Sequence, residues 1–250
     1  MSEGKIQLLN NPYGQVAYEK FRKSELAFAD KSGVIESLDN AEMTPYPVLL
    51  RPRRFGKSTF VQMLKCFYDI SYADRYDEIF FKTNIYEKNL PGHNSYHVIN
   101  FNFSGVSGIK EDTLIRSFII AVNSGLNDFM VRYPDFVFNP TEIEKETPSG
   151  FIKSFFDAYK RYPSKKYLYL MVDEYDNFAN NVLSQDLELF KAITGTGGFL
   201  KDFYAAIKEG AETCIARTFI TGVSSVSLDS LTSGFNISLN VTSDKNFGSP

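Results

Sequence analysis

Short apolar runs alternate with longer stretches of helical spacing along most of the chain. The apolar runs predict strands over residues 46–50, 97–103, 167–172, about 213–223 and, more weakly, 235–241. Apolar residues at every third or fourth position predict helices over about 59–67, 111–133, 148–162 and 199–208. Strands that alternate with helices in this way are typical of βαβ units. We therefore expect an α/β fold in which helices sandwich a mainly parallel central sheet.

The pattern also predicts how the chain is organised. Residues 167–172 are apolar at nearly every position, which indicates a strand covered on both faces at the centre of the sheet. Residues 134–148 favour a surface loop rather than a domain linker. We expect one domain, with an N-terminal segment over about 1–45, a core over 46–241 and a polar tail over 242–250. Because the tail brings no closing helix, we expect the sequence to be a fragment.

Composition narrows the class of protein but names no partner. The chain has 250 residues, of which 43% are apolar, and 27 Lys and Arg against 30 Asp and Glu give a net charge of −3. This charge excludes the strongly basic balance of a dedicated nucleic-acid coat. Cys66 and Cys214 are too few for a disulfide framework or a zinc cluster, and His93 and His97 lack metal-ligand neighbours. With neither a signal peptide nor an uninterrupted apolar run of about 18 to 20 residues, we expect a cytoplasmic protein without a membrane partner.

The strongest motif lies between the first predicted strand and the first predicted helix. Gly56, Lys57 and Ser58 at such a junction are typical of the end of a P-loop, whose backbone N–H groups face nucleotide phosphates. Lys57 would reach the β and γ oxygens, and Ser58 would bind Mg²⁺. Arg51 stands where the motif usually begins with Gly, so a surface helix cap is the alternative interpretation. The residues predicted to contact nucleotide are Arg53, Arg54, Phe55, Gly56, Lys57, Ser58 and Thr59.

A second motif, Asp173-Glu174, ends the apolar run that we place at the sheet centre. A carboxylate at the carboxyl end of a central parallel strand lies in the crevice where α/β sheets bind ligands, as in a Walker B motif. Asp173 would hold Mg²⁺ through water, and Glu174 would polarise the attacking water. Asp176 would support this pair or cap a helix. Alone, the motif would more often begin a solvated loop, but the upstream Gly-Lys-Ser favours a nucleotide site.

A third feature is the strand that ends in hydroxyl residues near 219–225. P-loop ATPases of the additional-strand class place a polar sensor between the two Walker strands, and Thr221 and Ser224 are the candidates. A turn cap is the alternative for each. Arg217, Arg53 and Arg54 are candidates for an arginine finger. The predicted catalytic residues are therefore Glu174, Lys57 and Thr221, and the predicted metal ligands are Ser58 and Asp173.

Several segments together resemble one family, the predicted AAA-ATPase-like domains of many bacterial proteins. They are residues 29–32, 51–58, 172–176, 199–208, 221–224 and 227–236. The resemblance extends from about Tyr13 to Phe247, and Arg at the first P-loop position is ordinary in this family. It implies an ATPase core that in longer relatives continues into a helical lid and often a nuclease domain. We expect neither within these 250 residues.

The resemblance also implies cofactors and partners. ATP and Mg²⁺ are the expected cofactors. The expected partners are ATP and ADP, further copies of the chain in a homo-oligomer, and nucleic acid bound through the C-terminal domain that lies beyond this sequence.

Three functions fit these motifs. The first is Mg-dependent ATP hydrolysis that powers or gates an associated activity such as nucleic-acid processing. The second is a nucleotide-gated interaction module with negligible hydrolysis. The third, a small-molecule kinase, is disfavoured because such enzymes need no Glu to activate water and usually carry an arginine-rich lid. Glu174 favours the first function.

Overall fold

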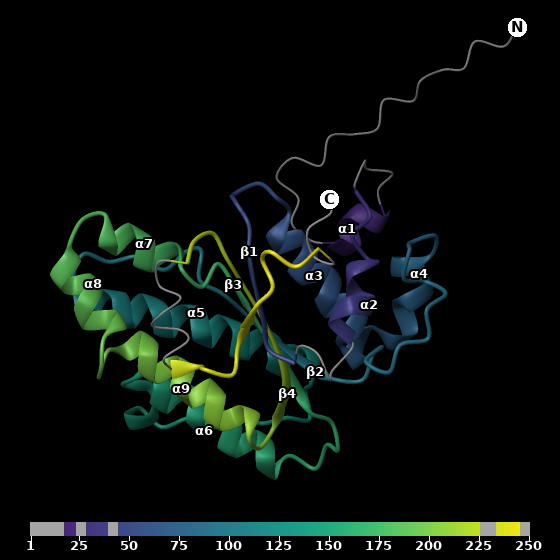
Figure 1. Ribbon diagram of the computed structural model, residues 1–250. Coiled ribbons are helices and arrows are strands. Elements are labelled where there is room, and N and C mark those ends of the chain that lie inside the picture. The colour runs from purple at the N-terminus through teal and green to yellow at the C-terminus, as the bar shows by residue number, and fades with distance from the viewer. Residues whose placement is uncertain (1–17, 24–28, 40–44, 226–233, 246–250) are drawn as a thin grey trace, which may run out of the picture.

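Five strands, all parallel, form the central sheet in the order β2-β3-β4-β1-β5 (Figure 1). The computed structural model describes residues 18–23, 29–39, 45–225 and 234–245. The strands are β1 (Pro47–Leu50), β2 (His97–Asn102), β3 (Leu168–Asp173), β4 (Ile215–Gly222) and β5 (Leu239–Asn240). The expected parallel sheet is confirmed, and β4 lies between β1 and β3.

Helices cover both faces of this sheet (Figure 1). One face carries α1 (Tyr18–Lys23), α2 (Val34–Asp39), α3 (Lys57–Tyr68) and α4 (Tyr76–Phe80). The other carries α5 (Glu111–Arg132), α6 (Pro148–Arg161), α7 (Asn177–Leu183), α8 (Leu187–Thr194) and α9 (Phe199–Ala211). Two 3₁₀ turns, η1 (Ile70–Arg75) and η2 (Ile143–Lys145), complete the described elements. All six residues of β3 are buried, with Leu170 in one core and Met171 in the other, so the predicted doubly covered strand is confirmed.

The long elements follow the sequence pattern, and the short ones do not. The four predicted helices and the first four strands form within a few residues of their expected bounds. The fifth strand is shorter than predicted, because only Leu239–Asn240 pairs with β1. The sequence pattern missed α1, α2, α4, α7 and α8, which are five to eight residues long and span too few turns for a clear period.

Helix α5 is long and apolar enough to cross a membrane, by length and composition alone. Our sequence criterion of an uninterrupted apolar run did not detect it. In the fold, one stripe of the helix that includes Leu114, Phe118 and Phe129 is buried, while Ile120 and Val131 are exposed. The core helix of an α/β protein meets the same length and composition test.

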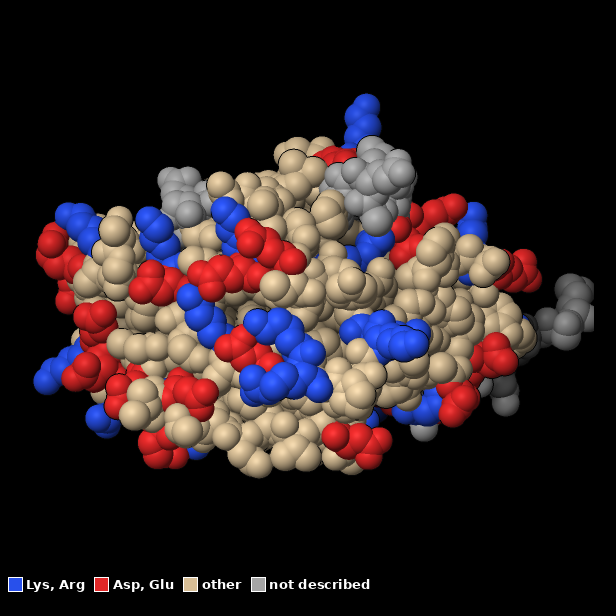
Figure 2. All heavy atoms as spheres, turned by 90° about the horizontal axis from the view of Figure 1, so that it is seen from below, with Lys and Arg blue, Asp and Glu red and all other residues tan. Residues whose placement is uncertain are grey.

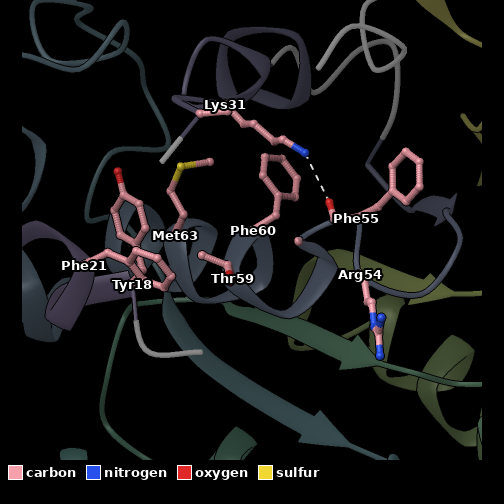
Figure 3. Close-up of a pocket in the computed structure, with 10 residues that line it drawn as sticks. Tyr18, Phe21, Lys31, Arg54, Phe55, Thr59, Phe60 and Met63 are labelled. Atoms are coloured by element: carbon pink, nitrogen blue, oxygen red, sulfur yellow. Dashed lines mark hydrogen bonds between the residues drawn. The ribbon is translucent and has the colours of Figure 1, made fainter. Parts of the chain in front are cut away.

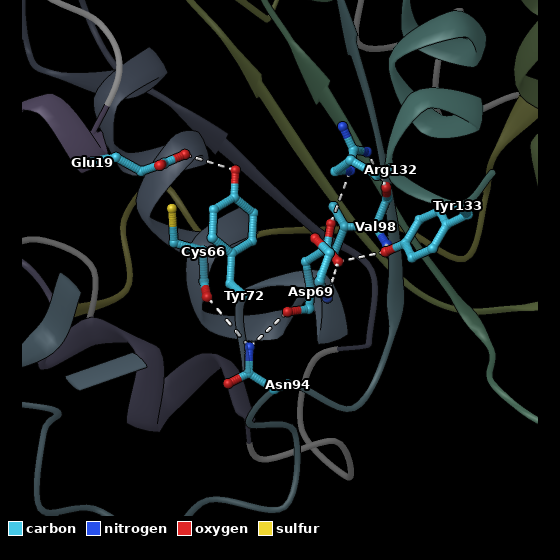
Figure 4. Close-up of polar contacts among 9 residues, drawn as sticks. Glu19, Cys66, Asp69, Tyr72, Asn94, Val98, Arg132 and Tyr133 are labelled. Atoms are coloured by element: carbon cyan, nitrogen blue, oxygen red, sulfur yellow. Dashed lines mark hydrogen bonds and ion pairs between the residues drawn. The ribbon is translucent and has the colours of Figure 1, made fainter. Parts of the chain in front are cut away.

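Buried polar contacts join α3 to α5 at the amino end of β2 (Figure 4). Asp69, which follows α3, forms an ion pair with Arg132 at 3.2 Å and accepts a hydrogen bond from the Tyr133 hydroxyl. Arg132 also donates to the Val98 carbonyl at 2.6 Å. The network therefore fixes the ends of two helices that lie on opposite faces of the sheet. The network lies at the amino ends of the strands, opposite the edge where their carboxyl ends meet.

Charged side chains of both signs are mixed on the surface. The last residues of α6, Lys160 and Arg161, are exposed, as are Lys165 and Lys166 in the connection to β3. Lys160 pairs with Asp157 at 2.5 Å. Figure 2 views the molecule from below and shows Lys and Arg side chains near the centre of that face, with Asp and Glu among them and around them. This mixture agrees with the small net charge of the chain.

Gly125 tests the packing of α5 on β2. A Cβ atom at this position would lie 2.6 Å from the Asn100 carbonyl oxygen in β2. Because a backbone oxygen cannot move without shifting the strand, we expect Gly125→Ala to lower the free energy of unfolding by about 1–3 kcal/mol in urea denaturation. Ser124→Ala, at an exposed position of the same helix, should be neutral or slightly stabilising. Equal stability of the two variants would contradict this packing.

Candidate functional site

The strand register brings the predicted motifs to one edge of the sheet. Asp173 pairs in register with Asn102 of β2, and Leu50 of β1 pairs with Gly222 of β4. Because all strands are parallel, their carboxyl ends meet there. The loop after β1, the acidic residues after β3 and Thr221 near the end of β4 therefore surround a single crevice.

The loop after β1 has the backbone of an anion-binding turn. Arg54 and Gly56 adopt left-handed conformations, with φ of 69° and 73°, and Gly56 is the N-cap of α3. Only glycine adopts this region without steric cost. A left-handed turn before a helix directs successive N–H groups toward one point, and the first N–H groups of α3 have no partner within the helix. We name residues 51–57 the phosphate loop for this geometry.

Lys57 lies beneath the phosphate loop rather than in solvent. Its side chain is 6% exposed, and its ammonium donates to the carbonyls of Arg51 at 3.0 Å and Pro52 at 3.2 Å. Each trans peptide points its carbonyl and its N–H in opposite directions. The bond to the Pro52 carbonyl therefore turns the Arg53 N–H away from Lys57.

Arg51, at the position where the motif usually has Gly, connects the phosphate loop to the C-terminal segment. Its guanidinium donates to the Thr242 carbonyl at 2.8 Å, and the Thr242 hydroxyl accepts from the Leu50 N–H at 2.9 Å. The Arg51 N–H donates to the Gly222 carbonyl at 3.0 Å. The side chain of Arg51 thus binds Thr242 in the C-terminal segment, and its backbone N–H binds Gly222 at the end of β4.

The acidic residues after β3 have distinct surroundings. Asp173 is 2% exposed and accepts a 2.6 Å hydrogen bond from the Thr221 hydroxyl. Glu174 is partly buried and has a φ of 55°, a strained conformation for a residue with a side chain. Burial, and then the neighbouring Asp173 charge, raises the pKa of Glu174, while Lys57 and Arg53 oppose this rise. Glu174 is therefore a stronger base than an ordinary glutamate.

Asp176 is neither a helix cap by its side chain nor a residue of the open crevice. Its buried carboxylate accepts from the N–H groups of Val223 at 3.1 Å and Ser224 at 2.7 Å, and from the Asn180 amide at 2.9 Å. The Ser224 hydroxyl contacts Asn180 at 3.0 Å. Asp176 and Asn180 thus hold the turn after β4 in place, and Ser224 belongs to that support.

The three candidate arginines lie in different places. Arg217 is 5% exposed on β4, and its guanidinium donates to the carbonyls of Leu38 and Asp39 and to the Tyr96 hydroxyl. These bonds hold the end of α2, so the hypothesis of Arg217 as an arginine finger is wrong. Arg53 and Arg54 are exposed on the phosphate loop, and Arg53 donates to the Asn177 side chain at 3.0 Å.

A cavity of about 460 Å³ adjoins the phosphate loop. Aromatic and apolar side chains from α1 and α3 form most of its wall, and Lys31 reaches across it to the Phe55 carbonyl (Figure 3). The Phe55 ring and the Arg54 side chain point away from it. The lining residues are Tyr18, Phe21, Ala29, Lys31, Arg54, Phe55, Gly56, Thr59, Phe60 and Met63. Sequence reasoning missed Tyr18, Phe21, Phe60 and Met63, because an apolar position in a helix signals only core.

The residues present fit a magnesium ion bound mainly through substrate and water. Mg²⁺ takes one or two protein oxygens in such sites, and the Ser58 hydroxyl and the Asp173 carboxylate supply that chemistry. The described part of the chain contains no group of three His, Cys, Asp or Glu residues that could hold a metal alone.

Most of the 227–236 segment, which carries part of the family resemblance, lies outside the described residues.

Thr221 tests the arrangement of the crevice. Thr221→Val keeps the shape of the side chain but leaves the buried Asp173 carboxylate without its hydroxyl donor. We expect a loss of about 1–3 kcal/mol in the free energy of unfolding at neutral pH, measured in urea. Thr221→Ser keeps the donor and should lose less. A serine variant as unstable as the valine variant would show that the methyl group, not the hydrogen bond, matters.

Comparison with known proteins gives one match. The family model described as a predicted AAA-ATPase matches residues 12–232. No curated protein and no solved structure matches the chain. The match covers most of the chain and includes the phosphate loop, the acidic residues after β3 and Thr221, which the fold gathers at one sheet edge. The chain is therefore a member of the predicted AAA-ATPase family.

Proposed function

We propose that this protein binds ATP with Mg²⁺ at the carboxyl edge of the sheet and hydrolyses it. The observation that carries the proposal is the placement of two motifs across one strand. The N-terminus of α3 and Lys57 lie on the β1 side of β4, and Asp173 and Glu174 lie on the β3 side. A crevice with N–H donors and an ammonium on one side and carboxylates on the other suits a phosphate chain that is attacked by water.

The phosphates would occupy the concave side of the phosphate loop. The N–H groups of the turn and of the first residues of α3 would donate to their oxygens, and Lys57 would move from its loop carbonyls toward the β and γ oxygens. Ser58 and Asp173 would hold the metal, which neutralises phosphate charge when bound. Thr59, in the first turn of α3, lines the adjoining cavity.

The cavity supports the choice of a nucleotide over inorganic phosphate. Its aromatic and apolar wall suits a flat base, and its volume lies within the usual range for small-molecule sites. Stacking of a base on an aromatic ring contributes about 1–3 kcal/mol. We place the adenine ring beside Phe60 and Met63, on the α3 side of the phosphate loop.

Glu174 is the proposed base for the attacking water. It is partly buried beside Asp173, its pKa is raised, and its strained backbone is typical of residues held in place for function. Thr221, whose hydroxyl donates to Asp173, would act as the polar sensor that orients Asp173 toward the γ-phosphate.

A second candidate function is a nucleotide-gated interaction module with negligible hydrolysis. The observation that favours it is a relay from the phosphate loop to the loop after β2: Arg53 donates to the Asn177 side chain, which donates to the Ser104 carbonyl at 3.0 Å. Phosphate that recruits Arg53 would release Asn177.

The cytoplasmic location, self-association, a nucleic-acid partner and the division into segment, core and tail stay predictions.

Two substitutions separate binding from hydrolysis. Lys57→Ala removes the principal ammonium at the phosphates, so we expect Mg-ATP affinity to fall by about two orders of magnitude in calorimetric titration.

Glu174→Gln keeps the shape and polarity of the side chain but removes the base. We expect it to bind Mg-ATP like the parent chain and to hydrolyse it about two to four orders of magnitude more slowly.

Controls make this comparison decisive. Asp173→Asn should weaken Mg-ATP binding more than binding of metal-free ADP. Normal Mg-ATP affinity of Lys57→Ala would exclude the phosphate loop as the site. Normal turnover of Glu174→Gln would exclude Glu174 as the base, and tight binding without turnover in the parent chain would favour the gated module.

The pH dependence of turnover tests the surroundings of Glu174. A base must be ionised, so turnover should fall on acidification, and the raised pKa places this fall above the ordinary glutamate value of 4.5. Arg53 lowers the pKa of Glu174, so Arg53→Gln should move the fall to still higher pH. Arg116→Gln, at an exposed position on α5, is the matched control. An identical acid limb for Arg53→Gln and Arg116→Gln would contradict the proposed influence of Arg53.

A further inference from the structure

Lys31 is a second lysine at the phosphate loop, and it comes from the N-terminal part of the chain. Its ammonium donates to the Phe55 carbonyl at 3.1 Å (Figure 3). The same nitrogen is the nearest side-chain atom to the open Cβ position of Gly56, at 3.9 Å. Within the described residues Lys31 forms no ion pair with an acidic side chain. The loop carbonyl is thus the partner that this charge faces.

The backbone around Lys31 is held on both sides. The Asp30 carboxylate accepts from the Ser32 N–H at 2.9 Å and from the Asn84 N–H at 2.7 Å. Ser32 is fully buried, and its hydroxyl accepts from the Ile85 N–H at 3.1 Å. Both neighbours of Lys31 are therefore fixed to residues 84–85, and the lysine extends from an anchored base rather than from a free strand.

The bond to Phe55 acts on the peptide that joins Phe55 to Gly56. Because a trans peptide is planar, its carbonyl and its N–H point in opposite directions. An ammonium that holds the Phe55 carbonyl on one side of the loop therefore holds the Gly56 N–H on the other. Gly56 has no Cβ and a φ of 73°, so this peptide would otherwise rotate at small cost.

Lys31 and Lys57 divide the phosphate loop between them. Lys57 binds the carbonyls of Arg51 and Pro52 at the start of the loop, and Lys31 binds the Phe55 carbonyl at its end. Both contacts place positive charge against carbonyls and leave N–H groups for a ligand. Lys57 would leave its carbonyls to meet phosphate, whereas Lys31 can keep its bond while ligand is bound.

We propose that Lys31 is a positioning residue for phosphate binding, which acts by fixing the Phe55–Gly56 peptide so that the Gly56 N–H faces the phosphates. The proposal rests on the proposed function of the same site and adds a residue from outside the P-loop motif. It makes Lys31 part of the phosphate site and not only a wall of the adjoining cavity.

The test uses Lys31→Met, which keeps side-chain length but removes the donor, and Lys31→Arg, which keeps a donor. We expect Lys31→Met to weaken Mg-ATP and ADP about tenfold or more in calorimetric titration, because a hydrogen bond to a charged group is lost. Adenosine, which has no phosphate, should lose less affinity than Mg-ATP in ligand-observed NMR, because Lys31 only lines the cavity that would hold the adenine ring. Lys31→Arg should restore most of the lost ATP affinity. Lys20→Met, at an exposed position of α1, is the matched control and should bind ATP like the parent.

A second measurement reads the loop without any nucleotide. Amide hydrogen exchange of the 53–57 segment should be faster in Lys31→Met than in the parent and in Lys20→Met, while the rest of the described core exchanges as before. A local change of this kind separates loss of the loop contact from loss of the fold.

Each outcome decides one question. Unchanged ATP affinity in Lys31→Met, or an equal loss for adenosine, would overturn the positioning role, and so would failure of Lys31→Arg to restore binding. If the parent binds no ATP, or if Lys57→Ala binds it normally, the proposed function fails instead. In that case the hydrogen-exchange comparison alone decides whether Lys31 holds the loop, and unchanged exchange would overturn it.

Discussion

The position of β4 between β1 and β3 is the constraint on which the site depends. Neighbouring strands lie about 4.8 Å apart, so one intervening strand separates the loops after β1 and β3 by about 10 Å. Directly adjacent strands would set the two loops only about 5 Å apart at the sheet edge. The same strand brings Thr221 into the gap, where its hydroxyl binds Asp173. The position of β4 thus sets both the distance between the two loops and the contact of Thr221 with Asp173.

Sequence alone predicts where these motifs lie in the fold because their signals are local. Gly56, Lys57 and Ser58 identify a helix start with the backbone of an anion-binding turn, and the apolar run before Asp173 identifies a covered strand. A parallel sheet then requires both motifs to lie at one edge. Thr221 was predictable for the same reason, since it ends an apolar strand. The long helices followed from periodicity over three or more turns, as in α5 and α6.

Other features depend on contacts that no local pattern contains. Arg217 has the appearance of a catalytic arginine in the sequence, but its position near the start of β4 directs it to the end of α2. Asp176 follows the acidic pair, but the turn after β4 supplies two N–H groups that take its carboxylate. The cavity beside the phosphate loop combines α1 with α3, and short helices such as α1 form through tertiary packing rather than through their own periodicity.

Arg51 places the phosphate loop between distant parts of the chain. It binds Thr242, which lies 191 positions later, while the other end of the loop is bound by residue 31. A ligand that binds only the folded loop stabilises the fold by mass action, by about 2.7 kcal/mol at one hundred times its dissociation constant. That stabilisation reaches every segment whose order depends on the loop. Local opening of the segments around Lys31 and Thr242 would thereby be linked to occupancy of the loop, so a bound ligand would slow proteolysis at both segments.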